Sequence, residues 1–194
     1  MVHLLSLCVY CGSSDAVAPE HLGAAEALGR LAAQQKVDIV FGGGRVGLMG
    51  AVADGALAEG GWVVGIIPRH LEDREVGHRA ASEYHVVDSM HARKQLMFQR
   101  SDAFCVLPGG LGTLDEAFEI ITWKQLGLHD KPIVVINPAG YWDPLLHMID
   151  HQIAAGYLRG PTSRLFTVAE SPEAALEAVR AAPEPRVAAD SERL

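Results

Sequence analysis

Residues 102–116 read DAFCVLPGGLGTLDE, and this stretch predicts the fold. An apolar strand runs into Pro108, Gly109 and Gly110, and a helix is expected to begin at about Thr113. A strand that passes through a glycine-rich turn into a helix is the repeating unit of a parallel sheet. The T-x-x-E spacing of Thr113 and Glu116 predicts a capping box, while the glycines allow the backbone to approach an anion. Both interpretations stand at this point.

The rest of the chain repeats this unit. Apolar stretches that predict strands lie at 4–10, 37–41, 62–68, 85–88, 131–137 and 165–169, and amphipathic segments separate most of them. Continuous apolar strands of this kind indicate a parallel sheet that is covered on both faces. We therefore predict a Rossmann-like, doubly wound α/β fold, with one nucleotide-binding domain over residues 1–182. Residues 183–194 contain few apolar side chains and are expected to form a mobile tail.

Composition limits the classes of function. The 194 residues are 49% hydrophobic and carry a formal net charge of -8, with no basic run that would bind a nucleic acid polymer. The start MVHLLSLCVY lacks the features of a signal peptide, and no apolar run is long enough to span a membrane. An odd count of 3 cysteines suits a reducing compartment. We expect a cytoplasmic protein without a membrane or nucleic acid partner.

Three loops that follow predicted strands contain the small residues that phosphate sites use. They are CGSS at 11–14, GGGRVGLMG at 42–50 and PGGLGTLDE at 108–116. Because the carboxyl ends of parallel strands share one edge of the sheet, these loops predict a phosphate or nucleotide site there. The spacing of Gly42, Gly44 and Gly47 also matches a dinucleotide fingerprint. However, the next strand ends in Pro-Arg-His rather than an acidic residue, so NAD(P) is disfavoured.

The stretch SMHARK at 89–94 places two cations near a predicted helix start. Ser89 is a typical N-cap, so Arg93 and Lys94 lie where the helix dipole disfavours positive charge. A bound phosphate would compensate for this cost, because one guanidinium group can donate two parallel hydrogen bonds to a phosphate. The alternative is that both cations are solvated on the surface.

Other motifs do not predict a cofactor or metal. Cys8 and Cys11 have CxxC spacing, but Cys8 lies within a strand, where the two side chains would point to opposite faces. His147 and His151 are one helical turn apart but lack the glutamate of HExxH. The lysines have no recognisable Schiff-base context, so pyridoxal phosphate is not indicated either.

The motifs FGGGRVGLMG, DSMHARK and LPGGLGTLDE, in this order, resemble the LONELY GUY-type cytokinin riboside 5′-monophosphate phosphoribohydrolases. The resemblance runs from about Leu5 to Gly160 and includes GYWDPLL at 140–146. Some members carry an older lysine decarboxylase label. The resemblance implies an N-glycosidase that releases free base and ribose 5-phosphate from nucleoside 5′-monophosphates. It also implies a homodimer.

The resemblance assigns roles to individual residues. It implies that Arg93 and Glu116 are catalytic, and that the substrate and its phosphate are bound by Ser14, Gly43, Met90, Lys94, Gly109, Gly110, Gly112 and Thr113. Ala92 departs from the family, which often has Glu there. Two alternatives remain: AMP as the main substrate, or a non-catalytic carrier of nucleotide or molybdenum cofactor. The joint presence of Arg93 and Glu116 favours the enzyme.

Overall fold

The architecture is taken from a computed structural model that describes residues 4–72, 76–158 and 160–187. Within these residues, seven strands form one sheet in which every neighbouring pair is parallel. The order across the sheet is β4-β3-β2-β1-β5-β6-β7. The strands are β1 (Ser6–Tyr10), β2 (Asp38–Phe41), β3 (Val63–Pro68), β4 (Glu83–Val87), β5 (Ala103–Val106), β6 (Ile133–Ile136) and β7 (Thr167–Ala169).

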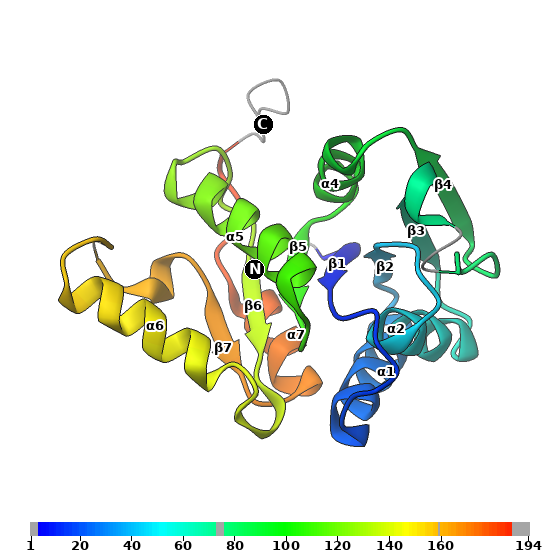
Figure 1. The fold of residues 1–194 in the computed structure, drawn as a ribbon, viewed down its shortest axis with the longest axis horizontal. Helices are drawn as coiled ribbons and strands as arrows, with labels where there is room; N and C mark the ends of the chain where they lie inside the picture. Colours follow the sequence, from blue (N-terminus) through cyan, green and yellow to red (C-terminus); the bar gives the residue numbers. More distant parts are fainter. Residues whose placement is uncertain (1–3, 73–75, 159, 188–194) are drawn as a thin grey trace.

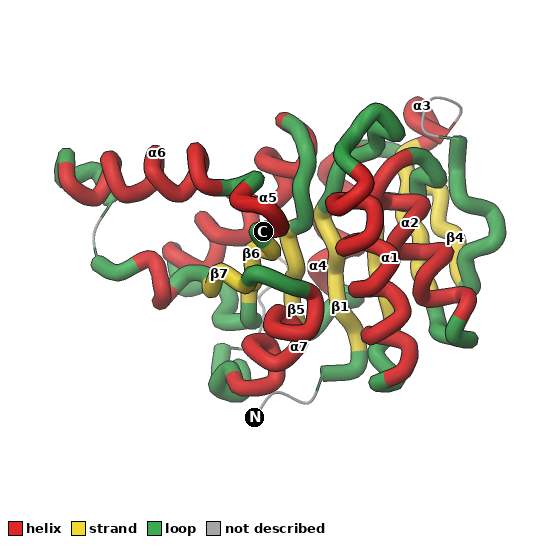
Figure 2. Tube along the Cα trace, turned by 90° about the horizontal axis from the view of Figure 1, so that it is seen from below, coloured by secondary structure: helices red, strands yellow, loops and turns green. Residues whose placement is uncertain are grey.

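Helices connect the strands and cover both faces of the sheet (Figures 1 and 2). They are α1 (Pro19–Gln34), α2 (Gly47–Ala58), α3 (Arg69–Glu72), α4 (Met90–Gln99), α5 (Leu111–Gln125), α6 (Asp143–Ala154) and α7 (Pro172–Ala181), with short 3-10 turns η1 (Pro138–Gly140) and η2 (Thr162–Arg164). The predicted doubly wound α/β fold is confirmed. The short helix α3 was not expected from the sequence.

Two apolar layers follow from the alternation of side chains along the strands. Leu7 and Val9 of β1 pack with buried residues of α1, α2 and α7 in one cluster. Cys8 and Tyr10 point to the other face and pack with residues of α4, α5 and α6. Cys11 lies in the first cluster, so Cys8 and Cys11 are on opposite faces, as their spacing predicts. Figure 1 shows α4 on one side of the sheet and α1 and α2 on the other.

The strand order places the candidate site. The chain moves outward in one direction from β1 to β4, and then in the other direction from β5 to β7. The order therefore reverses between β1 and β5, and sheets of this type bind ligands at the carboxyl ends of the strands at such a point. The loops after β1 and β5 are joined there, because the N–H of Gly12 donates to the carbonyl of Pro108 at 3.0 Å.

The beginning of the predicted tail lies against the domain. The backbone N–H groups of Arg186 and Val187 donate to the carboxylate of Asp130, at distances of 2.7 and 3.3 Å. These two residues thus contact the domain, the mobility of the tail stays a prediction, and residues 188–194 lie outside the described residues.

Candidate active site

A cavity of about 250 Å³ opens at the carboxyl edge of the sheet, beside the reversal in strand order. Residues from the loop after β1, from α2, α3 and α4, and from the start of α5 meet in its wall. The lining residues are Cys11, Gly12, Ser13, Met49, Leu71, Met90, Arg93, Gly110, Gly112, Thr113 and Glu116. The three small-residue loops and the SMHARK stretch therefore each contribute to one cavity.

A buried guanidinium and a buried carboxylate face each other in this wall. Arg93 of α4 is 5% exposed and Glu116 of α5 is 8% exposed. Nη1 of Arg93 lies 3.9 Å from Oε1 of Glu116, and Nη2 donates to the carbonyl of Gly42 at 3.0 Å. Burial of an ion pair costs solvation free energy, which a protein compensates only through good geometry and added hydrogen bonds. The carbonyl at the end of β2 supplies such a bond.

The position of Arg93 depends on the absence of a side chain at residue 42. A β-carbon added to Gly42 would overlap Nη2 of Arg93 and would press on Sδ of Met49. A larger residue would therefore displace the guanidinium from Glu116. This close approach is the local reason for a glycine at the end of β2.

The start of α5 corrects one expectation from the sequence. The helix begins at Leu111 with Gly110 as its N-cap, and the N–H of Leu114 donates to the carbonyl of Gly110 at 3.0 Å. Thr113 is therefore the third helical residue and Glu116 lies in the second turn, so the predicted capping box is wrong. A glutamate in the second turn is too far along the helix to reach back to the N-cap. Instead, the Glu116 carboxylate faces Arg93.

The helix starts at the cavity differ in how their N–H groups are satisfied. At α2, the carboxylate of Asp15 accepts from Gly47 at 2.8 Å, and the carbonyl of Gly12 accepts from Leu48 at 3.0 Å. At α4, Ser89 Oγ accepts from Ala92 at 3.1 Å. The start of α5 has no side-chain cap within the described residues. An anion is therefore best bound at α5, where N–H groups of the first turn lack partners within the helix.

Comparison with known proteins identifies the family. Residues 49–179 match a family model described as "Possible lysine decarboxylase". A cytokinin riboside 5′-monophosphate phosphoribohydrolase of Rhodococcoides fascians is 43% identical over 176 residues, which cover 90% of this chain and 89% of that protein. The chain belongs to the LONELY GUY-type family. The enzyme LOG3 of Arabidopsis thaliana is 44% identical over 162 residues, which cover 84% of this chain and 75% of that protein.

Solved structures share the fold of this LONELY GUY-type chain at lower identity. The molybdenum cofactor binding protein from Rippkaea orientalis has a TM-score of 0.69 and 22% identity, over 93% of this chain and 98% of that one. The molybdenum cofactor carrier protein of Chlamydomonas reinhardtii also has a TM-score of 0.69 and 22% identity, over 91% of this chain and 96% of that one. At this level of identity the likeness concerns the fold alone.

Most of the predicted LONELY GUY-type site residues come together. Six of them line the cavity, namely Met90, Arg93, Gly110, Gly112, Thr113 and Glu116. Three others lie in the adjoining loops: Gly109 packs against Thr113, Ser14 against Gly47, and Gly43 against Ile66 and Ile67. Their roles in binding remain predictions.

Lys94 lies away from the cavity lining. Its Nζ is 3.2 Å from Asp115 Oδ2 and 3.1 Å from Glu119 Oε2, both on α5. Burial lowers the pKa of Lys94, but the hydrogen bonds that its ammonium donates to Glu119 and Asp115 outweigh this, and its pKa lies above the usual value. Lys94 therefore joins α4 to α5, next to the Arg93–Glu116 contact, and its role in binding the substrate stays a prediction.

Five cavity residues were not predicted. Cys11, Gly12 and Ser13 belong to the CGSS loop, from which only Ser14 was predicted. Met49 lies in the GLMG stretch at 47–50, at the start of α2. Its position in a glycine-rich loop after a strand was a signal that could have placed it at the site. Leu71 comes from α3, and no sequence pattern pointed to it because that helix has a single turn.

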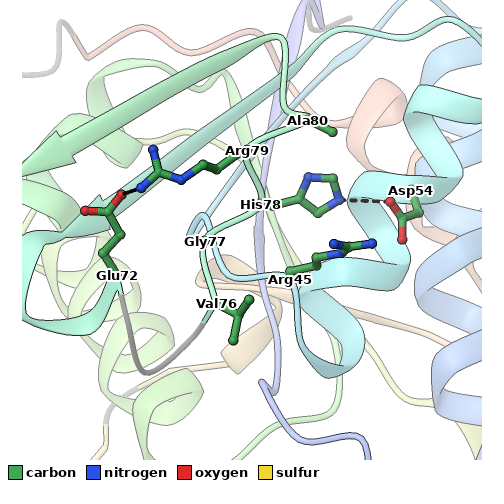
Figure 3. Close-up of a pocket in the computed structure, with 8 residues that line it drawn as sticks. All are labelled: Arg45, Asp54, Glu72, Val76, Gly77, His78, Arg79 and Ala80. Atoms are coloured by element: carbon green, nitrogen blue, oxygen red, sulfur yellow. Dashed lines mark hydrogen bonds and ion pairs between the residues drawn. The ribbon is translucent and has the colours of Figure 1, made fainter.

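A larger cavity of about 530 Å³ lies beside the loop after α3 (Figure 3). Arg45, from the glycine-rich loop after β2, lines this second cavity. Figure 3 shows two contacts between its side chains: Arg79 contacts Glu72, and His78 Nε2 lies 2.8 Å from Asp54 Oδ1.

Among the described residues, no group of three or more His, Cys, Asp or Glu side chains could hold a metal ion. The three cysteines are buried free thiols, and burial raises the pKa of Cys105 to about 12. A thiol with so high a pKa is protonated at neutral pH. In the same part of the chain, every helix is too short or too polar to cross a membrane.

Proposed function

We propose that this protein is a cytokinin riboside 5′-monophosphate phosphoribohydrolase, which hydrolyses the N-glycosidic bond of adenine-type nucleoside 5′-monophosphates to free base and ribose 5-phosphate. The observation that carries the proposal is the buried Arg93–Glu116 contact, 3.9 Å apart, in a cavity that also receives the uncapped start of α5. Relatives at 42–45% identity carry this activity in their names.

The start of α5 is proposed to bind the 5′-phosphate. Its first-turn N–H groups and the positive end of the helix dipole favour a dianion. Gly110 and Gly112 line the cavity without side chains, so the phosphate oxygens can approach the backbone closely. Gly109 packs against Thr113, so a side chain at residue 109 would collide with it.

Glu116 is proposed to act on the ribosyl carbon. Cleavage of a ribosyl C–N bond builds positive charge on the sugar, as in other oxocarbenium-like transfers. A carboxylate at that carbon stabilises the charge and can take a proton from the attacking water. Arg93 holds the carboxylate in place and is itself fixed by the carbonyl of Gly42. The leaving base requires a proton or hydrogen bonds, and we assign no residue to that step.

The cavity composition supports a base with an apolar substituent. Cys11, Met49, Leu71 and Met90 give the cavity an apolar wall beside the polar groups of α5. Methionine side chains are flexible and adapt to irregular apolar groups. We therefore propose prenylated adenine nucleotides as the main substrates and AMP as the second candidate.

The decisive experiment follows base release by chromatography from isopentenyladenosine monophosphate, AMP and the two matching ribosides. We expect release from the monophosphates and not from the ribosides. Glu116→Gln should retain nucleotide binding and lower kcat at least about 100-fold. The amide can neither take a proton from the attacking water nor stabilise positive charge on the sugar as a carboxylate does. Glu119→Gln on the same helix is the matched control and should stay close to the parent rate. Nucleotide binding without base release from any substrate would favour a carrier.

The assembly is proposed to be a cytoplasmic homodimer of single-domain chains. Leu111 at the start of α5 is 85% exposed, and Leu126, just after its last residue, is 68% exposed. Exposed apolar side chains of this kind can contribute to a protein interface, and the surface around Leu126 is our candidate. Light scattering coupled to size-exclusion chromatography measures the mass, and Leu126→Glu should shift it toward the monomer if this surface is the interface.

A further inference from the structure

A tyrosine outside the cavity contacts the loop that leads into α5. Tyr141 follows the 3-10 turn η1 at the end of β6, 32 residues from the glycine loop. Its hydroxyl donates to the carbonyl oxygen of Gly109 at 2.7 Å. The strand β6 neighbours β5 in the sheet, so the fold brings this side chain to the loop after β5.

The Tyr141 ring is held from two sides. The ring of His21 in α1 packs against it edge-to-face, with 5.1 Å between ring centroids and an interplanar angle of 78°. The ring of Trp142 packs in the same way, at 4.8 Å between centroids and 83°. Trp142 is itself 4% exposed, and its backbone N–H donates to Asn137 Oδ1 at 2.6 Å. Although Tyr141 is 39% exposed, its hydroxyl therefore has a position set by several elements.

This hydrogen bond fixes one peptide unit of the loop. In a trans peptide the C=O of Gly109 and the N–H of Gly110 point in opposite directions, because the unit is planar. While the carbonyl points to Tyr141, the N–H of Gly110 points away from it. A peptide between two glycines rotates at low cost, since neither residue has a β-carbon that limits its backbone angles. Without the tyrosine, this unit would sample other orientations.

We propose that Tyr141 is a positioning residue for phosphate binding, which keeps the Gly109–Gly110 peptide in the orientation that presents the Gly110 N–H to the substrate's phosphate. The inference rests on the proposed function, because it takes the start of α5 as the phosphate site. Gly110 lines the cavity and is the N-cap of α5, so its N–H continues the row of first-turn donors. The loop is held on its other side by the bond from Gly12 N–H to the Pro108 carbonyl.

The test is Tyr141→Phe, which removes the hydroxyl and retains the ring contacts with His21 and Trp142. Loss of one neutral hydrogen bond should weaken binding of ribose 5-phosphate, measured by calorimetry, by about 5-fold. The KM for isopentenyladenosine monophosphate should rise by a similar factor while kcat changes little, because the reacting carbon and Glu116 are untouched. Tyr157→Phe, at a tyrosine that is 89% exposed, is the matched control and should change neither constant.

The calorimetry tests the role of Tyr141, and the base-release assay tests the proposed hydrolysis. An unchanged affinity for ribose 5-phosphate in Tyr141→Phe would overturn the role of Tyr141, and so would a fall in kcat with KM unchanged. If the parent protein binds ribose 5-phosphate but releases no base, the proposed hydrolysis fails while the calorimetric test of Tyr141 still stands. The two failures are therefore distinguishable.

Discussion

A buried histidine should make the protein sensitive to mild acid. His129 is 1% exposed and lies against the rings of Phe98 and Phe104, at 5.1 and 6.0 Å between centroids. The N–H of Lys131 donates to its Nδ1 at 3.1 Å, so Nε2 carries the hydrogen and donates to the Ile120 carbonyl at 2.8 Å. Protonation would place a second hydrogen on Nδ1, facing the Lys131 N–H. Burial lowers the pKa of His129 to about 4.

The sign and size of the effect follow from linkage. The histidine pKa in the unfolded chain is about 6.5, so between about pH 6.5 and 4 the unfolded state binds a proton that the native state excludes. The stabilisation by the neutral ring is present above that window and is lost as the pH falls through it. With these two pKa values, the free energy of unfolding falls by about 2 kcal/mol between about pH 7.5 and 5.

His129→Gln isolates this contribution. Glutamine keeps an N–H for the Ile120 carbonyl and does not titrate. Urea unfolding at about pH 7.5 and 5, followed by tryptophan fluorescence, should show that the variant loses about 2 kcal/mol less than the parent over that interval. His147→Gln, at an exposed histidine of α6, is the control and should keep the parental loss. An identical pH dependence for parent and His129→Gln would refute the reasoning.

Two further substitutions test the geometry of the site. Gly42→Ala should lower kcat at least about 10-fold by displacing the Arg93 guanidinium, whereas Gly23→Ala, with nothing close to its added β-carbon, should be neutral in the same base-release assay. Lys94→Met should lower the free energy of unfolding in urea by about 1 kcal/mol, because it breaks two ion pairs to α5 at a residue 14% exposed. A large rise in KM for Lys94→Met with unchanged stability would instead place Lys94 on the phosphate.

The sequence predicted the fold class because periodicity reports burial directly. Apolar runs such as those around Leu7 and Ile39 identify strands buried on both faces, and the helices between them require parallel pairing. The order of the strands follows from packing between distant segments and was not predicted. The single turn of α3 was also missed, because four residues show no period, and Leu71 was missed with it.

The error at α5 has a local physical cause. A T-x-x-E spacing identifies two residues that can cap a helix, but it does not say where the helix begins. Gly110 takes an extended conformation, and helical hydrogen bonding therefore starts at Leu111. As a result, Thr113 packs on Gly109 and the Glu116 carboxylate turns to Arg93. Sequence spacing selected two residues that line the cavity, and it predicted the wrong contacts for them.

A chain with net charge -8 needs a local source of positive potential for the phosphate dianion that we propose it binds. Lys94 contributes little positive potential to the cavity, because Asp115 and Glu119 neutralise it. Glu116 partly neutralises the charge of Arg93. The start of α5 is then the main source of positive potential in the cavity. Backbone dipoles keep their direction only while the loop keeps its conformation. If the phosphate binds where we propose, the contacts that hold the Gly109–Gly110 peptide therefore affect its binding as directly as any charged side chain in the cavity.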